Sequence, residues 1–409
     1  MERLVSVFGL FVMIFLAWLI SSDRRNINWR IIVGGLALQF AFAWLLLDTG
    51  PDPKSGTGPL AAVGRGFNLL LSHADIGAQF LFGSAFRHQI FAFKVLPTII
   101  FFSALMGALY HLGAIQFVVR LLGWLMQKTL RTSGAESLSA SANIFFGQTE
   151  APLVVKPYLE RMTDSEIMAV MVGGFATVAG GVMAAYISMG IDAGHLLTAS
   201  IISAPASLLI AKVIQPESGQ PQTLGKSAVQ FERTTVNLLD AVATGAADGA
   251  KLAINIAAML IAFLGLIALM DTLLGAMGSR IFHQEWSLAT LLGYLFAPLA
   301  WLMGVESKDV LRIGELVGLR MAANEFIAYE RLAEWMQPDS TVHLSRRSQV
   351  IATYALCGFA NLGSIGVQIG GLSTLAPSRR NDFARLGFRA MLGGTLACFM
   401  TACIAGALL

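Results

Sequence analysis

A polar run interrupts a strongly apolar region of this chain at Asn143–Pro152. The run reads Asn-Ile-Phe-Phe-Gly-Gln-Thr-Glu-Ala-Pro, so it carries amides, a hydroxyl and a carboxylate. Such groups are costly inside a membrane unless they have partners. Irregular backbone at membrane depth is tolerated where it is buried in protein or lines a cavity. The run therefore predicts the tip of a re-entrant hairpin, expected over Glu136–Arg161, and a second break of this kind is expected at Ala322–Phe326.

The composition fixes the class of protein to which these breaks belong. Hydrophobic residues make up 56% of the 409 residues, charged residues only 13%, and the mean hydropathy is +0.67. Soluble domains carry about 25% charged residues, so we expect an all-α polytopic membrane protein. A net charge of +3 gives no indication of nucleic-acid binding. The sequence has no phosphate-binding loop, dinucleotide fingerprint or nucleophile elbow, which disfavours a primary pump or an enzyme.

Eight apolar stretches are expected to cross the membrane, each about long enough for a ~30 Å hydrocarbon core. The fourth is interrupted by two pairs of glycines, and the seventh is broken by a Gly-rich segment. The eighth follows a basic loop at Pro377–Arg389. The first six are Leu4–Ile20, Ile31–Leu47, Phe91–Leu112, Ile167–Met189, Leu196–Val213 and Leu252–Met270. Interfacial helices are expected at Phe67–Phe86 and Ile115–Leu125. Arginines in the loop after the first span and in the Pro377–Arg389 loop place these two loops on the cytoplasmic side.

The second half of the chain repeats the pattern of the first. Trp124-Leu125-Met126 precedes the first tip and Trp301-Leu302-Met303 the second, while Gly174–Gly180 resembles Gly358–Ser364. Each half contains a span, an interfacial helix, a hairpin, a broken span and a span. The interfacial helix and the hairpin do not cross the membrane, so each half crosses it three times. Because this number is odd, the second half is inverted relative to the first. We therefore expect an N-terminal scaffold (1–90), a first inverted repeat (91–214), a cytoplasmic connector (215–248) and a second inverted repeat (249–409), an arrangement typical of secondary transporters.

The polar groups at the breaks suit a neutral ligand that has a flat ring and several hydroxyls. Amides, hydroxyls and carboxylates supply mixed donors and acceptors, and an aromatic ring offers a packing surface. These groups are Gln148, Thr149, Glu150, Asn324, Glu325, Phe359, Asn361 and Ser364. Asn143, Thr177 and nearby carbonyls form an oxygen-only set that fits Na⁺. Hydrogen bonds that only hold helices together would explain the same residues, and the sequence alone leaves both interpretations open.

Three segments carry a resemblance to a known family. They are Gly147–Glu150, Gly318–Tyr329, and Gly358–Asn361 together with Ser364. At these residues the chain resembles the concentrative nucleoside transporter family, whose signature at the second tip is similar to Gly-x-Lys-x-x-x-Asn-Glu-Phe-Val-Ala. Arg320 stands at the lysine of that signature and Ile327 at its valine.

The resemblance implies a role for each matching residue. Nucleobase contacts would fall on Gln148, Thr149, Glu150 and Val182, and ribose contacts on Glu325, Phe359, Asn361 and Ser364. The sodium site would use the Asn143 side chain, the Phe146 carbonyl, the Thr177 hydroxyl and the Val178 carbonyl. The resemblance also implies a homotrimer in a bacterial inner membrane, which imports uridine-like nucleosides with Na⁺ as coupling ion and no other cofactor. Proton coupling through Glu150 is the alternative.

Overall fold

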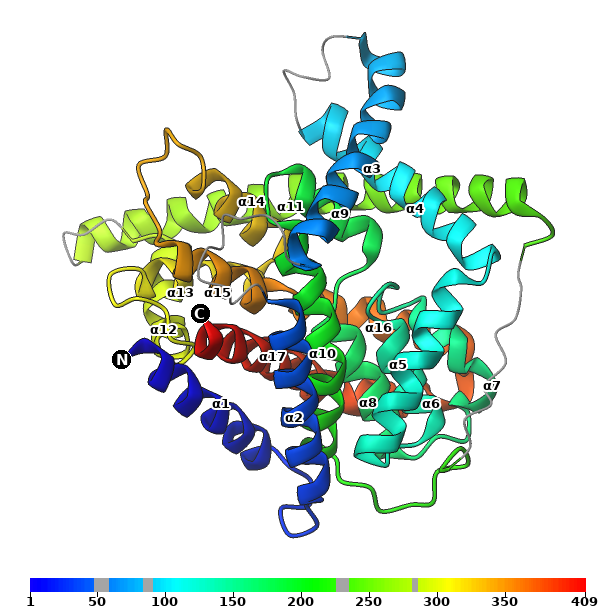
Figure 1. Ribbon diagram of the computed structural model, residues 1–409. Helices are drawn as coiled ribbons and strands as arrows, with labels where there is room; N and C mark the ends of the chain where they lie inside the picture. The colour runs from blue at the N-terminus through cyan, green and yellow to red at the C-terminus, as the bar shows by residue number, and fades with distance from the viewer. Residues whose placement is uncertain (48–58, 84–90, 226–234, 282–285) are drawn as a thin grey trace.

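The computed structural model describes residues 1–47, 59–83, 91–225, 235–281 and 286–409, and within these ranges every regular element is helical. This confirms the all-α prediction (Figure 1). The elements of the N-terminal part and the first repeat are α1 (Glu2–Leu19), α2 (Trp29–Leu46), α3 (Pro59–Phe82), η2 (Phe91–Val95), α4 (Leu96–His111), α5 (Ala114–Leu130), α6 (Gly134–Ala142), η3 (Ala151–Val155), α7 (Lys156–Leu159), α8 (Asp164–Ala176), α9 (Gly180–Ser188) and α10 (Ala193–Ile214). Those of the second repeat are α11 (Leu238–Ile281), α12 (Leu288–Leu302), α13 (Val310–Ala322), α14 (Glu325–Trp335), α15 (Arg346–Leu356), α16 (Leu362–Leu375), η4 (Pro377–Arg379) and α17 (Arg380–Leu408).

In the described part of the chain, seven helices are long and apolar enough to cross a membrane. One of them joins α8 and α9 across a short break. These seven correspond to seven of the eight expected spans. The remaining expected span is the broken one, formed by α15 and α16, and each of these helices is too short by itself to count. The protein is therefore a multi-pass membrane protein whose two interrupted spans lie at equivalent places in the two repeats.

Both repeats also pack in the same way. In the first repeat α5 packs against the first hairpin arm α6, and in the second α12 packs against α13. The last helices of the two repeats, α10 and α17, pack against each other, and the N-terminal helices α2 and α1 lie against them (Figure 1). The broken spans thus pack against α10 and α17, mainly through α8 and α15.

α4 and α11 pack against each other and approach closely. A Cβ atom added at Gly107 would lie 2.6 Å from the Ala241 carbonyl oxygen, and one at Gly245 would lie 2.5 Å from the Ser103 carbonyl oxygen. α9 reaches the same surface of α4 at Gly181, where an added Cβ would lie 3.0 Å from Ser103 Oγ. Glycine is required at Gly107 and Gly245 because the facing backbone leaves no room for a side chain, whereas at Gly181 the neighbour is a serine side chain.

Two expected boundaries are wrong. α11 has 44 residues and already begins at Leu238, inside the segment expected to be a polar connector. α17 begins at Arg380, so most of the expected Pro377–Arg389 loop is helix. Asp382 explains the second error, because it pairs with Arg379 at 2.6 Å and with Arg385 at 3.0 Å. Pairs three residues apart stabilise a helical turn, so charged residues here extend the helix beyond the apolar stretch.

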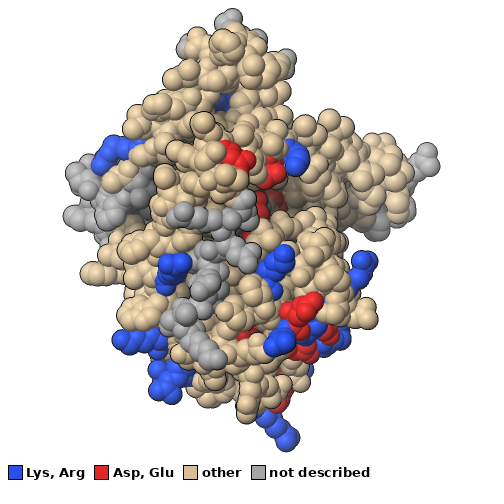
Figure 2. Space-filling model, turned by 90° about the vertical axis from the view of Figure 1, so that its right-hand side faces the viewer, with Lys and Arg blue, Asp and Glu red and all other residues tan. Residues whose placement is uncertain are grey.

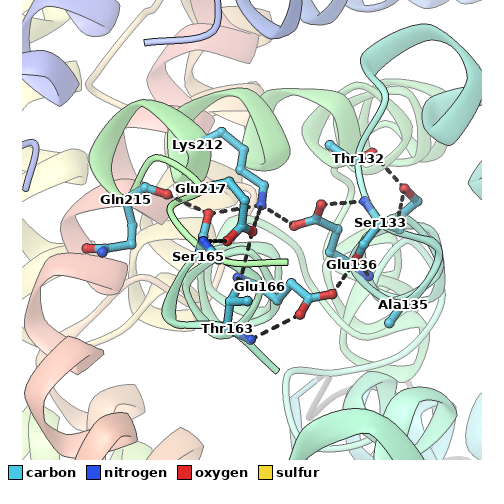
Figure 3. A network of polar contacts seen from close by, with 12 residues as sticks. Thr132, Ser133, Ala135, Glu136, Thr163, Ser165, Glu166, Lys212, Gln215 and Glu217 are labelled. Carbon is cyan, nitrogen blue, oxygen red and sulfur yellow. Dashed lines mark hydrogen bonds and ion pairs between the residues drawn. The ribbon is translucent and has the colours of Figure 1, made fainter. Parts of the chain in front are cut away.

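A buried polar network joins the beginnings of α6 and α8 (Figure 3). Both helices begin with a capping box, and Ser133 Oγ of the first donates to Glu166 Oε1 of the second at 2.6 Å. Lys212, on α10, pairs with Glu136 at 2.6 Å and with Glu217 at 3.2 Å. A buried charge is tolerated when it is paired and hydrogen-bonded. The network therefore fixes two helices whose opposite ends lead into the first hairpin tip and the first break.

Candidate functional site

The first hairpin has the helix–break–helix form that its sequence predicts. α6 ends at Ala142, the next eight residues are irregular, and the chain becomes helical again at Ala151-Pro152. The tip is docked through its own carbonyl groups, because Ile144 accepts from Ser200 Oγ at 3.0 Å and Phe145 accepts from the Gly180 amide at 3.0 Å. These bonds satisfy backbone groups that the break frees.

The broken spans of the two repeats meet at their interruptions. The first break covers 177–179, between the two glycine pairs, while Gly173 and Gly174 themselves are helical. The amide of Phe359 in the second break donates to the Thr177 carbonyl oxygen at 3.3 Å. An added Cβ at Gly358 would lie 2.6 Å from the Phe175 carbonyl oxygen. The crossing therefore depends on a glycine, and the two repeats share this junction.

The second hairpin supplies a buried carboxylate to this region. Asn324 caps α14, since its side chain accepts from the Ile327 amide at 3.0 Å. Glu325 follows and is only 5% exposed. Its Oε1 accepts from the Tyr186 hydroxyl at 3.3 Å and its Oε2 accepts from Asn361 Nδ2 at 3.0 Å. The structure thus brings two residues of the expected ribose set into direct contact.

The other two residues of the expected ribose set lie close by. Asn361 caps α16, because its Oδ1 accepts from the Ser364 amide at 2.9 Å. Ser364 is buried on the first turn of α16, and Phe359 is half-buried in the break. Tyr186 was not among the expected site residues. A tyrosine within an otherwise apolar stretch was the available signal, since a buried hydroxyl normally needs a partner.

Arg320 anchors the second hairpin behind the carboxylate. Its side chain is completely buried and donates to three acceptors, the carbonyl oxygens of Ala355 (2.7 Å) and Gly358 (3.3 Å) and the sulfur of Cys398 (3.3 Å). The two carbonyls flank or belong to the second break. A guanidinium presents several donors in a fixed fork, so it satisfies backbone groups that the end of α15 leaves unpaired.

The expected nucleobase residues divide into two surroundings. Gln148 and Thr149 face the broken spans: an added Cβ at Gly174 would lie 2.9 Å from Gln148 Cβ, and one at Gly371 would lie 2.8 Å from the Thr149 methyl group. Glu150 is exposed, accepts from the Gly147 amide at 3.3 Å, and points to a pocket. Val182 is buried on α9.

The pocket at Glu150 has a volume of about 310 Å³ and lies between the first hairpin, the start of α9, and helices α4 and α11. Tyr110 and Phe146 line it with their rings at 5.6 Å, and Asp248 contributes a carboxylate from α11. Neither Glu325 nor Asn361 is among its lining residues. Figure 2 shows acidic side chains gathered in a hollow on the right-hand face of the molecule. Glu150 thus lines this pocket, whereas Glu325 contacts Tyr186 and Asn361.

Two of the four expected sodium ligands, Asn143 and Thr177, lie at Gly173 on α8. Asn143 is fully buried, its Nδ2 donates to the Ser139 carbonyl oxygen at 3.0 Å, and its Oδ1 has no partner among the described residues. Thr177 Oγ1 donates to the Gly173 carbonyl oxygen at 2.9 Å, and an added Cβ at Gly173 would lie 3.0 Å from Asn143 Nδ2. Val178 is buried in the break and Phe146 half-buried at the tip.

An unpartnered buried oxygen fits a cation that prefers neutral oxygen ligands. A buried acceptor without a partner is costly, and a bound cation would remove that cost at Asn143. Within the part of the chain that the structure describes, no group of three or more His, Cys, Asp or Glu residues could hold a metal ion. The amide, hydroxyl and backbone oxygens of the expected set are of the kind that suits Na⁺.

Three sequence profiles together match almost the whole chain. They are described as the N-terminus of Na⁺-dependent nucleoside transporters (8–85), nucleoside recognition (92–193) and the C-terminus of Na⁺-dependent nucleoside transporters (195–406). Solved structures of the transporter CNTnw agree: an inward-facing, substrate-bound state superposes with a TM-score of 0.92 at 42% identity over 100% of this chain and 98% of that chain. A variant of CNTnw in an intermediate state gives 0.94 at 42% identity, covering 100% of this chain and 99% of that chain.

Relatives in other organisms agree with the profiles. Solute carrier family 28 member 3 of Homo sapiens is 44% identical over 418 residues, which cover all of this chain and 60% of that protein. An uncharacterized transporter of Haemophilus influenzae is 45% identical, covering 99% of this chain and 98% of that protein. The chain spans about three fifths of the vertebrate relatives that it matches. By these matches, and by a superposition with CNTnw that covers the whole chain, the chain belongs to the Na⁺-dependent, concentrative nucleoside transporter family.

Proposed function

We propose that this protein is a sodium-coupled symporter that carries nucleosides into the cell by alternating access. One observation carries the proposal: Thr177 has its hydroxyl in the oxygen set suited to Na⁺, and its carbonyl oxygen accepts from Phe359 in the break next to Asn361. Ion and nucleoside would therefore bind on two sides of the same backbone junction, so that ordering of one side favours the other.

The nucleoside would be held by both hairpins. Glu325 and Asn361 form a preassembled acceptor–amide pair that suits ribose hydroxyls, with Ser364 and Phe359 beside it. Gln148, Thr149 and Glu150 at the first tip would read the base, and Val182 would pack on its face. Buried polar groups of this kind discriminate strongly against a ligand that leaves them unpaired. The solute passes through chemically unchanged, so no enzymatic activity is proposed.

Sodium would supply the driving force. The Asn143 side chain, the Phe146 and Val178 carbonyls and the Thr177 hydroxyl would hold the ion as a second transported substrate. Its entry releases about 2.3 kcal/mol per charge for each 100 mV of potential, in addition to the concentration gradient. Binding of Na⁺ at the end of α6 would order the first hairpin and so complete the surface that contacts the base. The hairpins and broken spans, with ion and nucleoside bound, would then move against α4 and α11.

The proposal includes the setting of the protein. Import through a bacterial inner membrane is supported by the similarity to the Haemophilus transporter, which this chain matches over almost its full length. A homotrimer is supported by the family and by apolar side chains along α11 that are exposed in the single chain, such as Ile254 and Ile261. No part of the proposal requires a further cofactor or nucleic acid.

Proton coupling is the second candidate, and the exposure of Glu150 in its pocket favours it. Uptake of labelled uridine into proteoliposomes distinguishes Na⁺ coupling from proton coupling. One sample has an inward Na⁺ gradient at equal pH, and the other has an inward proton gradient in the absence of Na⁺. We expect accumulation only with the Na⁺ gradient. Accumulation driven by the proton gradient alone would show that H⁺, and not Na⁺, is the coupling ion. Absence of uptake under both gradients would contradict nucleoside symport.

Substitutions at the adjacent glycines Gly173 and Gly174 of α8 should affect the apparent affinities for Na⁺ and for nucleoside differently. Gly173→Ala places a methyl group against Asn143, whereas Gly174→Ala places one against Gln148. Overpacking costs typically 1–3 kcal/mol, so we expect Gly173→Ala to raise the Na⁺ concentration for half-maximal uptake about tenfold. For Gly174→Ala the main effect should be a nucleoside KM about tenfold higher. Gly366→Ala, on α16 with open space around it, is the matched control; equal effects of both α8 variants on both constants would contradict the assignment.

A further inference from the structure

A buried glutamine that no site assignment includes reaches from α16 to the first broken span. Gln368 is 1% exposed, and its Nε2 donates to the Met171 carbonyl oxygen of α8 at 3.0 Å. This carbonyl lies within the last two turns before the break at Thr177. The side chain therefore ties the second half of one broken span to the first half of the other.

Gln368 meets the first hairpin tip at Gly174. A Cβ atom added at Gly174 would lie 2.5 Å from Gln368 Nε2 and 2.9 Å from Gln148 Cβ. Both glutamines thus approach the position that a side chain at residue 174 would occupy. The missing side chain is what allows the amide of Gln368 to approach Gln148.

The bond to Met171 fixes the polarity of the Gln368 amide. A backbone carbonyl can only accept, so the NH₂ group must face Met171 and the Oε1 must face away from it. That Oε1 is buried and has no partner among the described residues, and the same holds for Gln148 Oε1. Two buried acceptors on neighbouring amides call for donors, because a buried acceptor left unpaired costs the full desolvation penalty.

An unpartnered glutamine oxygen is not by itself a signal in this protein. Gln39, on α2, has the same bonding, with Nε2 donating to the Gly35 carbonyl oxygen at 3.0 Å and a buried Oε1 without a partner. Gln39 bonds within its own helix, α2, which packs against α10. The position beside Gln148 is what distinguishes Gln368.

We propose that Gln368 is a positioning residue for recognition of the base, an inference that rests on the proposed function. In the loaded state Gln368 Oε1 accepts a hydrogen bond from Gln148 Nε2. This bond leaves Gln148 Oε1 as an acceptor of fixed direction for an N–H group on the edge of the base. The chain of amides from Met171 through Gln368 to Gln148 thus makes the site select bases that present an N–H donor.

The test compares uridine with 3-methyluridine, which differs by replacement of the ring N–H by N–CH₃. Vmax/KM for Na⁺-driven uptake into proteoliposomes is measured for both. Wild-type protein should prefer uridine, and Gln368→Met, which keeps the length of the side chain but has no amide, should lower this preference about 5- to 10-fold. Gln39→Met is the matched control and should keep the wild-type preference. Gln368→Asn, whose amide is one methylene too short to reach both partners, should behave as Gln368→Met does.

The outcomes distinguish this inference from the proposed function. A monodisperse variant at position 368 could lose uptake of uridine and of 3-methyluridine equally, with its preference for uridine unchanged. That result would assign Gln368 a structural role and overturn the inference. An unchanged preference in the variants together with full activity would do the same. Failure of the wild-type protein to accumulate uridine with Na⁺ would instead refute the symport itself.

Discussion

Replacement of Glu325 by glutamine is expected to lower Vmax/KM for Na⁺-driven nucleoside uptake by about 100-fold or more. Both carboxylate oxygens accept hydrogen bonds, from Tyr186 and from Asn361. A glutamine keeps one oxygen and presents NH₂ at the other position. Asn361 cannot turn its amide to compensate, because its Oδ1 is already committed to the Ser364 amide. Hydrogen bonds to a charged group contribute about 1.5–3 kcal/mol each. Losing one of them and weakening the other to a neutral bond corresponds to the expected factor of about 100.

The measurement is uptake of labelled uridine into proteoliposomes containing equal amounts of monodisperse protein. Glu330→Gln is the matched control, because Glu330 lies on the same helix, α14, and is exposed. The control should transport like the wild-type protein. Uptake by Glu325→Gln within about threefold of wild type, a difference of less than 1 kcal/mol, would remove Glu325 from the site.

Arg320→Met is expected to abolish the folded transporter rather than weaken its affinity. The substitution leaves the carbonyl groups of Ala355 and Gly358 without their donor in a fully buried region. Each unsatisfied buried group costs about 1–3 kcal/mol, a large part of the 5–15 kcal/mol by which proteins are typically stable. Arg320→Lys should restore most of the yield, because an ammonium group also donates to carbonyls, although without the fixed fork.

Detergent-solubilised protein should report this effect directly. We expect little monodisperse Arg320→Met in size-exclusion chromatography, and a melting temperature for Arg320→Lys between that of Arg320→Met and that of wild type. Arg331→Met serves as control, since Arg331 is half-exposed on α14 and its nearest carboxylate contact is a long one of 3.9 Å. A stable, monodisperse Arg320→Met would show that Arg320 does not anchor the second hairpin.

Sequence predicted the breaks because their physical signal is local. Gln148, Glu150, Asn324 and Glu325 stand out in apolar surroundings, and Gly and Pro beside the first set mark the loss of regular helix. The structure has irregular backbone at both tips. The match between the two halves of the chain predicted the repeated order of elements for the same reason, since it needs only comparison of the chain with itself.

Partners that lie far apart in the chain could not be found in this way. Tyr186 contacts Glu325 from 139 residues away, and Gln368 bonds Met171 from 197 residues away. In the sequence both look like isolated polar residues in an apolar helix, which are typical of ordinary helix contacts. The identity of their partners depends on how the two repeats cross, and no spacing in the sequence contains that information.

The errors in helix boundaries have a different origin. Hydropathy marks where a chain is apolar, whereas a helix continues as long as its backbone bonds are satisfied. The first turns of α17 carry Arg380, Asp382 and Arg385 and remain helical through their own side-chain pairs and through a contact with Asp164 at 2.8 Å. Polar helix ends of this kind lie outside the window that hydropathy measures.

The contact of α9 with α4 has a consequence for the speed of the proposed transport cycle. At this contact Gly181 faces Ser103, and an added Cβ would come within 3.0 Å of the serine hydroxyl. Each pair of touching atoms contributes only about 0.1–0.2 kcal/mol, so two small residues leave little attraction to overcome when the surfaces separate. In the proposed transport cycle, in which α9 moves against α4, a larger residue at either position would interlock with the facing helix and slow turnover.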